Sequence, residues 1–222
     1  MRSQIWIHIL ADIGRNTFRY APFVLMSALG RVNTTESCGS KYGNVSWRDA
    51  PPSMEQLRIE RYLAGSSLAG KTLLHVGVGS SSVAKRFHAE SRQIDGLTVM
   101  ADEIAYADGL GYSNYRVYLV DKFSPAVSTT LPNRYHFIID NNPSSFAPSR
   151  AAFDWMIASY VELLEPGGMF LTDRVGMHYH EKYAFSIGDD DLAAFERVLP
   201  VRFERPTPSV RALVKLGSVT GQ

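Results

Sequence analysis

The fold is decided by the stretch Thr72-Leu73-Leu74-His75-Val76-Gly77-Val78-Gly79-Ser80-Ser81-Ser82-Val83-Ala84. Its apolar first half predicts a buried strand, and the small residues that follow predict a tight turn into a helix. Gly77 and Gly79 let the backbone turn sharply and approach a bound ligand, because neither residue carries a Cβ atom. The serines can cap the next helix, whose free N–H groups would then face that ligand. The stretch therefore predicts a site for a nucleoside-bearing cofactor.

Strand-like and helix-like segments alternate after this stretch, which is the pattern of βαβ units on a parallel sheet. The predicted strands are 72–77, 97–101, 116–120, 135–139 and 168–172, followed by two final strands at about 201–205 and 210–216. The short link Pro206-Thr207-Pro208 predicts that the last two strands form an antiparallel hairpin. Helices are predicted over 150–164 and from Asp189 to Leu199. We therefore expect an α/β fold with a mostly parallel seven-stranded Rossmann-like sheet and helices on both faces.

The N-terminal part of the chain is predicted to be a helical extension. Apolar residues recur at helical spacing over 3–14, and a second apolar stretch covers 18–29. A third helix is predicted after the capping box Ser53-x-x-Gln56, with Gly65 to end it. This spacing divides the chain into an extension over 1–65 and a cofactor-binding domain over 66–222. The extension is expected to form a lid, a part of the substrate pocket or a homodimer contact.

Composition excludes several classes of protein. The 222 residues are 45% hydrophobic with a formal net charge of +1, so nothing favours a polyanionic partner such as nucleic acid. Cys38 is the single cysteine, which excludes an internal disulfide and fits a reducing compartment. No apolar segment reaches the length of a membrane span. We expect a soluble cytoplasmic protein without a membrane partner.

Acidic residues follow the predicted strands at the edge where such folds bind ligands. In an open α/β sheet, ligands lie beyond the carboxyl ends of the strands. The polar groups expected there are Gly79-Ser80, Asp102-Glu103, Asp121-Lys122, Asp140-Asn141-Asn142 and Asp173-Arg174. A carboxylate after the second strand could accept hydrogen bonds from both hydroxyls of a ribose. The ordered series favours a nucleoside ligand over a solvated surface.

These motifs resemble those of the class I S-adenosylmethionine-dependent methyltransferases over roughly residues 70–216. The segment 73–80 resembles the first motif of that family, 135–140 resembles the fourth, and Leu163-Leu164-Glu165-Pro166-Gly167-Gly168-Met169-Phe170 resembles its approach to strand five. The resemblance implies S-adenosyl-L-methionine as cofactor and methyl transfer to oxygen or nitrogen of a small molecule. It also implies a set of cofactor-binding residues, namely His75, Gly77, Gly79, Ser80, Asp102, Glu103, Asp121, Lys122 and Asp140.

The resemblance assigns roles within that set. Asp102 or Glu103 falls where the family's ribose-binding acid lies, and the sequence leaves open which of the two it is. Asp121 is similar to the acid that reads the adenine amino group. His75 departs from the pattern, because most members carry an acid there, near the methionine moiety of the cofactor.

Candidate groups for the methyl acceptor come from the loops. His178 and His180 alternate around Tyr179, so an extended loop would direct both to one side as candidate bases. Solvated loop histidines are the alternative interpretation. The predicted substrate-binding residues are Lys41, Tyr42, Asn141, Asn142, Asp173 and Arg174.

A metal ion is not expected. The chain resembles the metal-dependent catechol-type O-methyltransferases in having acids after strands four and five, Asp140 and Asp173. In that family an asparagine follows the second acid, whereas here Arg174 would oppose a divalent cation. The run from Asp140 to Phe146 also resembles the motif of amino-methylating nucleic-acid enzymes, but it lacks the second proline. We therefore predict a small-molecule acceptor.

Other functions remain as alternatives. Gly77-x-Gly79-x-x-Ser82 approaches the dinucleotide fingerprint of NAD-dependent oxidoreductases but lacks its third glycine. An aminopropyl-type transferase would use the same fold. His75 also keeps open a non-catalytic protein that binds the cofactor or a partner.

Overall fold

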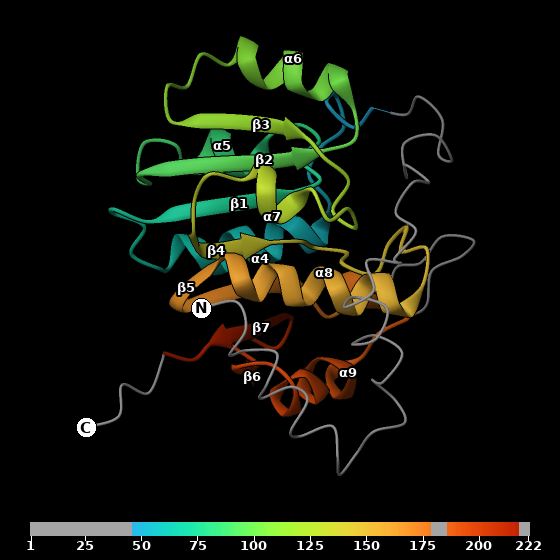
Figure 1. Ribbon diagram of the computed structural model, residues 1–222. Coiled ribbons are helices and arrows are strands. Elements are labelled where there is room, and N and C mark those ends of the chain that lie inside the picture. Colours follow the sequence, from blue (N-terminus) through green and yellow to red (C-terminus); the bar gives the residue numbers. More distant parts are fainter. Residues whose placement is uncertain (1–45, 179–185, 218–222) are drawn as a thin grey trace.

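The computed structural model describes residues 46–178 and 186–217, which form a sheet with helices on both faces (Figure 1). The sheet has seven strands in the order β3-β2-β1-β4-β5-β7-β6. Their bounds are β1 (Thr72–Val76), β2 (Gln93–Thr98), β3 (Tyr115–Leu119), β4 (Tyr135–Ile139), β5 (Leu164–Asp173), β6 (Val201–Glu204) and β7 (Val210–Lys215). The pairs from β3 through β5 are parallel, and β7 is antiparallel to β5 and to β6. The predicted sheet with its C-terminal hairpin is confirmed.

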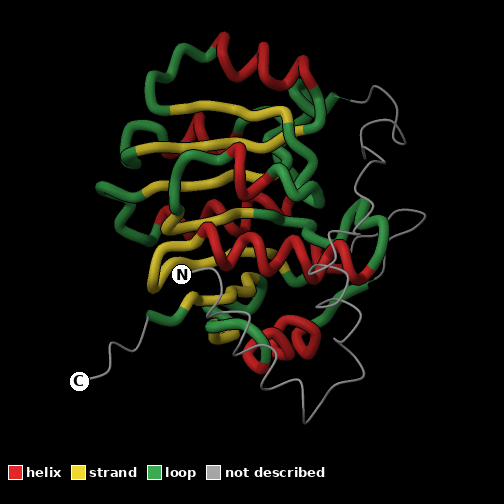
Figure 2. The backbone as a smooth tube through the Cα atoms, in the orientation of Figure 1, coloured by secondary structure: helices red, strands yellow, loops and turns green. Residues whose placement is uncertain are grey.

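Helices cover both faces of the sheet, as the tube drawing shows (Figure 2). They are α4 (Met54–Ala64), α5 (Ser82–Phe87), α6 (Ala101–Gly109), α7 (Val127–Thr130), α8 (Arg150–Leu163) and α9 (Asp189–Ala193), with short 3₁₀ turns η1 (Gly176–His178) and η2 (Ala194–Arg197). One apolar cluster joins α4 and α5 to the sheet, and a second joins α7 and α8 to its opposite face. Within the described ranges, no helix is long and apolar enough to cross a membrane.

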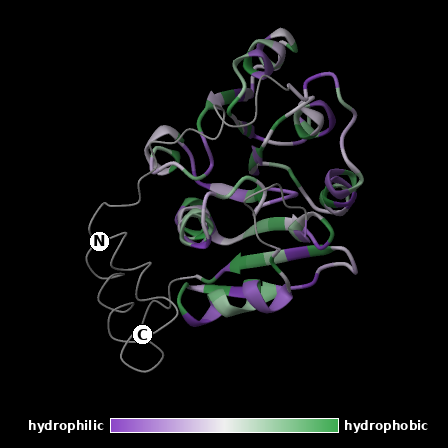
Figure 3. Cartoon of the chain, turned by 90° about the vertical axis from the view of Figure 1, so that its right-hand side faces the viewer, coloured by the Kyte–Doolittle hydropathy of each residue, from purple (hydrophilic) through white to green (hydrophobic). Residues whose placement is uncertain are grey.

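Alternating side chains of β1 join these two clusters. Leu73 packs with α4 and α5, whereas Leu74 and Val76 pack with α7 and α8 on the opposite face. The strand is buried along its whole length, as expected for a parallel strand covered on both sides. Hydrophobic residues concentrate between the layers in the view turned by 90° (Figure 3). The strand that carries the glycine turn is therefore held at the centre of the core.

The second strand was predicted wrongly. It runs over Gln93–Thr98 rather than 97–101, and residues 101–109 form α6. The strand was missed because it contains a charged residue, Asp95, which interrupts its apolar pattern. The Asp95 carboxylate is buried and accepts hydrogen bonds from Tyr135 (2.6 Å), Asn133 (2.8 Å) and Gln93 (2.9 Å). As a consequence, Asp102 and Glu103 lie in the first turn of a helix and not at the end of a strand.

Other boundaries differ less. α8 agrees with its prediction, while β5 begins earlier than predicted and the helix predicted from Asp189 to Leu199 divides into α9 and η2. α4 begins where predicted, because the Ser53 hydroxyl accepts from the Gln56 backbone N–H, but the Gln56 side chain binds Glu60 instead of closing the capping box. The helices predicted over 3–14 and 18–29 lie outside the described residues. The domain division at residue 65 stays a prediction, and α4 packs within the same core as the sheet.

Candidate functional site

The glycine turn lies where the strand order reverses. From β1 the chain proceeds to β2 and β3 on one side of the sheet and to β4 and β5 on the other. Gly77 and Gly79 both have positive φ, +70° and +46°, so a side chain at either position would strain the turn. The Gly77 N–H donates to the Leu97 carbonyl of β2, which holds the turn against the neighbouring strand. The turn is thus at the topological switch point, where folds of this type bind ligands.

Glu103 is held beside this turn by a small hydrogen-bond network. Its Oε2 accepts from the Thr98 hydroxyl at 2.5 Å, and its Oε1 accepts from the Trp47 backbone N–H at 3.0 Å. The side chain of Glu103 is buried, whereas Asp102 is 39% exposed and lies 3.9 Å from Arg48. Although both acids begin the same helix, Glu103 is the one that reaches back to the end of β2.

Lys122 and Asp140, which follow β3 and β4, form one ion pair. The Lys122 ammonium lies 2.9 Å and 3.2 Å from the two oxygens of Asp140 and also donates to the Asn142 carbonyl. The Tyr160 hydroxyl of α8 donates to the same carboxylate at 3.2 Å, and burial raises the pKa of Tyr160 well above its ordinary value. Asp121 is turned toward its own loop, where it accepts from the Phe123 N–H.

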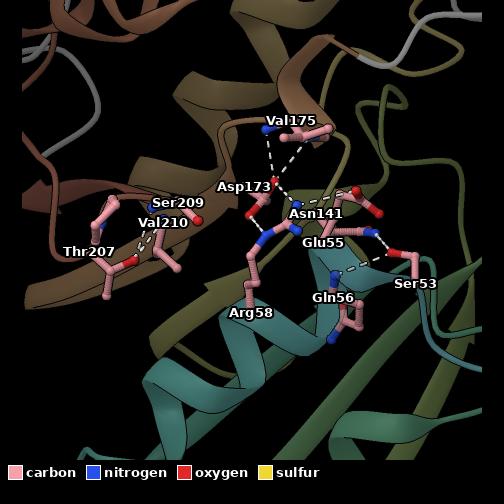
Figure 4. Close-up of polar contacts among 12 residues, drawn as sticks. Ser53, Glu55, Gln56, Arg58, Asn141, Asp173, Val175, Thr207, Ser209 and Val210 are labelled. Atoms are coloured by element: carbon pink, nitrogen blue, oxygen red, sulfur yellow. Dashed lines mark hydrogen bonds and ion pairs between the residues drawn. The ribbon is translucent and has the colours of Figure 1, made fainter.

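Asp173 is completely buried at the end of β5 and is bound by Arg58 of α4 (Figure 4). The guanidinium donates to both carboxylate oxygens at 2.8 Å, and the backbone N–H groups of Val175 and Gly176 donate to Oδ1. The hydrogen bond to Asp173 is the largest cause that raises the pKa of Arg58. These four donors connect α4 and the loop after β5 through one carboxylate.

The loops after β4 and β5 are also in direct contact. The Asn141 amide donates to the Ser53 hydroxyl at the start of α4 (Figure 4). A Cβ added at Gly176 would overlap the carbonyl oxygen of Asn141, so only glycine fits there. The start of α4 and these two loops therefore form one connected wall of the site.

His75 is buried on β1, below the glycine turn. Burial alone lowers its pKa to about 4, and its Nδ1 atom has no hydrogen-bond partner within the described part of the chain. The side chain is therefore neutral near pH 7.

The remaining predicted site residues are Ser80, Arg174, His178, His180, Lys41 and Tyr42. His178 is exposed, and its Nδ1 lies 2.6 Å from the Ser186 hydroxyl. Arg174 is also exposed, and its backbone N–H donates to Ser209. Ser80 is half-buried in the turn. His180, Lys41 and Tyr42 lie outside the described residues.

The two acids that follow β4 and β5, Asp140 and Asp173, each form an ion pair with a basic side chain. Asp140 pairs with Lys122 and Asp173 pairs with Arg58, rather than with the neighbouring Arg174. Over residues 46–178 and 186–217, no three histidine, cysteine or acidic side chains are placed to hold a metal ion.

Sequence reasoning missed Arg58, Trp47 and Thr98. Arg58 precedes its partner by 115 positions and Trp47 precedes Glu103 by 56, so no local pattern connects either pair. Only one local pattern involves Arg58: Glu55 lies one helical turn before it, and this spacing predicts the ion pair that the two residues form.

Comparisons with solved structures identify the fold. An N-methyltransferase, NodS from Bradyrhizobium japonicum WM9, in complex with S-adenosylhomocysteine, superposes with a TM-score of 0.54 at 11% identity over 72% of this chain and 85% of that one. Magnesium protoporphyrin IX methyltransferase (ChlM) from Synechocystis PCC 6803 with bound S-adenosylmethionine gives a TM-score of 0.53 at 14% identity, over 72% of this chain and 76% of that one. A chain from a complex with the Haloferax volcanii Trm112 methyltransferase activator gives a TM-score of 0.55 at 12% identity, over 72% of this chain and 89% of that one.

Sequence comparison adds no relative: no protein-family description and no curated protein matches the chain. The structural likeness extends over most of each compared chain and includes the same α/β core. Structural similarity at such low sequence identity establishes the fold. The chemistry has to be argued from the residues of the site. The protein has the Rossmann-like fold of the class I S-adenosylmethionine-dependent methyltransferases.

Proposed function

We propose that the protein is a methyltransferase that moves the methyl group of S-adenosyl-L-methionine to an oxygen or nitrogen atom of a small molecule. One observation carries this proposal: the Gly77–Gly79 turn and the Glu103 carboxylate lie side by side at the switch point of the sheet. The two glycines place no Cβ atom in the way of the cofactor, and a fixed carboxylate can accept hydrogen bonds from both hydroxyls of a ribose. The solved neighbours NodS and ChlM contain this cofactor or its demethylated product.

Exposed apolar residues at the same edge support a ring-bearing ligand. Val99 follows β2, Leu119 ends β3 and Val175 follows β5, and their exposed fractions are 38%, 56% and 50%. Large apolar side chains gathered at one edge are typical of surfaces that a ligand covers. The adenine would lie along the ends of β2 and β3, near Asp121, with the ribose at Glu103.

The methyl acceptor would lie on the other side of the switch point, near the loops after β4 and β5. The sulfonium cofactor is already activated, so the protein has to align the acceptor atom and, for a hydroxyl or ammonium, remove its proton. His178, exposed and oriented by Ser186, is the proposed base, and Asn141 and Asn142 are proposed to orient the acceptor. The net charge of +1 favours a small acceptor over nucleic acid, and the single cysteine fits a cytoplasmic setting.

Direct binding measurements test the cofactor assignment. In titration calorimetry with the full chain, S-adenosylhomocysteine is expected to bind with one site per chain, and NAD is expected to give no saturable heat. Glu103 can take the ribose hydroxyls of either molecule, but the third glycine of the dinucleotide fingerprint is missing here. Saturable binding of NAD alone would support an oxidoreductase, and binding of neither ligand would support a non-catalytic protein.

The assignment of Glu103 over Asp102 is tested by a matched pair of variants. Glu103→Gln is expected to weaken S-adenosylhomocysteine binding about 10- to 100-fold, because hydrogen bonds to a charged group contribute about 1.5–3 kcal/mol. Asp102→Asn, one position earlier on the same helix, is expected to change the dissociation constant by less than about threefold, since its partner is an exposed charge. The reverse order of effects would assign the ribose to Asp102.

A further inference from the structure

The chain crosses its own glycine turn just before α4. We call residues 46–50 the strap. A Cβ added at Gly79 would lie 3.4 Å from the Trp47 Cβ and 3.5 Å from its carbonyl oxygen, which is ordinary van der Waals contact. The Ala50 N–H donates to that same carbonyl and closes a turn within the strap. The strap therefore rests on the backbone that the cofactor is proposed to approach.

Polar contacts fix the strap at the end of β2 as well. The Trp47 N–H donates to Glu103, which is the carboxylate proposed to take the ribose. Arg48 lies 3.9 Å from Asp102, the next acid on the same helix turn. These contacts place the backbone of Trp47 between the turn after β1 and the Glu103 carboxylate of α6.

The side chain of Trp47 is exposed to solvent. It is 58% exposed, although tryptophan is one of the largest apolar side chains and its backbone here is well anchored. Val99 and Leu119, at the ends of the two neighbouring strands, are exposed too. An aromatic residue whose backbone is anchored and whose ring is exposed can serve as a stacking surface for a flat ring.

We propose that Trp47 is a cofactor-binding residue whose indole covers the adenine base. This inference rests on the proposed function, since it names the group that recognises the nucleoside of that cofactor. The Trp47 backbone N–H donates to the carboxylate proposed to take the ribose, so the strap holds Glu103 and carries the indole to the same part of the site.

Calorimetry on the full chain tests the proposal with S-adenosylhomocysteine, S-adenosylmethionine and adenosine as probes. Trp47→Ala is expected to weaken all three by a similar factor, about 5- to 150-fold, which is the usual effect of removing one aromatic ring from a stacked base. Trp47→Phe, which keeps a ring, is expected to stay within about fivefold of the wild type. Because the indole is exposed, thermal melts of both variants are expected to match the wild type.

Tryptophan fluorescence is a second, independent measurement. S-adenosylhomocysteine is expected to change the emission of the wild type with saturation, and Trp47→Phe is expected to abolish this change. Trp155 of α8 serves as the matched control, because Trp155→Phe should keep the response.

The outcomes separate the proposal from the proposed function. If the wild type binds S-adenosylhomocysteine and Trp47→Ala binds it equally well, the role of Trp47 is refuted and the cofactor assignment stands. If Trp47→Ala weakens S-adenosylmethionine alone, the indole covers the sulfonium and the base assignment is wrong. If the wild type binds none of the three probes, both proposals fail.

Discussion

Replacing Arg58 by methionine is expected to lower the free energy of unfolding by about 3–5 kcal/mol, which is the usual cost of leaving one partner of a buried ion pair alone. Asp173 is completely buried, and Arg58 supplies the only side-chain donors to it that the described residues show. Methionine keeps an unbranched apolar stem of similar length, so the change removes the charge with little loss of packing. Urea unfolding followed by circular dichroism measures the loss.

Two further variants make this result interpretable. Glu55→Gln removes the second ion-pair partner of Arg58. Because the Glu55 side chain is 26% exposed, this change is expected to lower the free energy of unfolding by less than about 1 kcal/mol. Asp173→Asn added to Arg58→Met is expected to recover part of the loss, because a neutral amide oxygen can still accept from the Val175 N–H. A loss below about 1 kcal/mol for Arg58→Met would show that the pair behaves like a surface salt bridge.

Acidification is expected to destabilise the protein by about 3 kcal/mol through His75 alone. Burial lowers the pKa of this histidine to about 4, whereas in the unfolded chain it takes its ordinary value of 6.5. Above pH 6.5 the side chain is neutral in both states and contributes nothing. As the pH falls from 6.5 to 4, the unfolded chain takes up a proton that the folded chain does not, so the folded state loses stability. Below pH 4 both states are protonated and the loss is complete.

Urea unfolding at pH 7 and pH 4.5 measures this effect. His75→Leu is expected to be at least as stable as the wild type at pH 7, because it removes a buried nitrogen without a partner, and to show a smaller loss at pH 4.5. His136→Leu is the control, since this strand histidine is only half-buried, and burial first and Lys71 second lower its pKa. An unchanged pH dependence in His75→Leu would contradict the assignment.

Most of the fold could be predicted from local patterns. β1, β4 and α8 were found because a fully buried strand, a largely apolar strand and an amphipathic helix leave regular apolar patterns. β2 was misplaced because Asp95 and Gly96 interrupt its apolar run. Only the contacts show why both residues belong there: Tyr135 and Asn133 bind the carboxylate, and the Val78 side chain occupies the space beside the glycine.

The candidate site divides in the same way. The strand-end rule placed Lys122 and Asp140 at one edge, yet their pairing depends on how β3 and β4 lie on opposite sides of β1. Substrate binding by Asp173 stays a prediction, and only the folded chain shows that Arg58 of α4 binds this carboxylate.

The sequence by itself determined the glycine turn between β1 and α5, because a buried strand followed by small residues has few other conformations open to it. It also placed Asp121, Asp140 and Asp173 at the ends of β3, β4 and β5, whereas it misplaced β2. Only the tertiary structure decided which acid faces the turn and what covers it. Those choices depend on two contacts between distant parts of the chain. Trp47 and Glu103 are separated by 56 positions, and Arg58 and Asp173 by 115. Such pairings exist only once the chain has folded, since no local spacing encodes them.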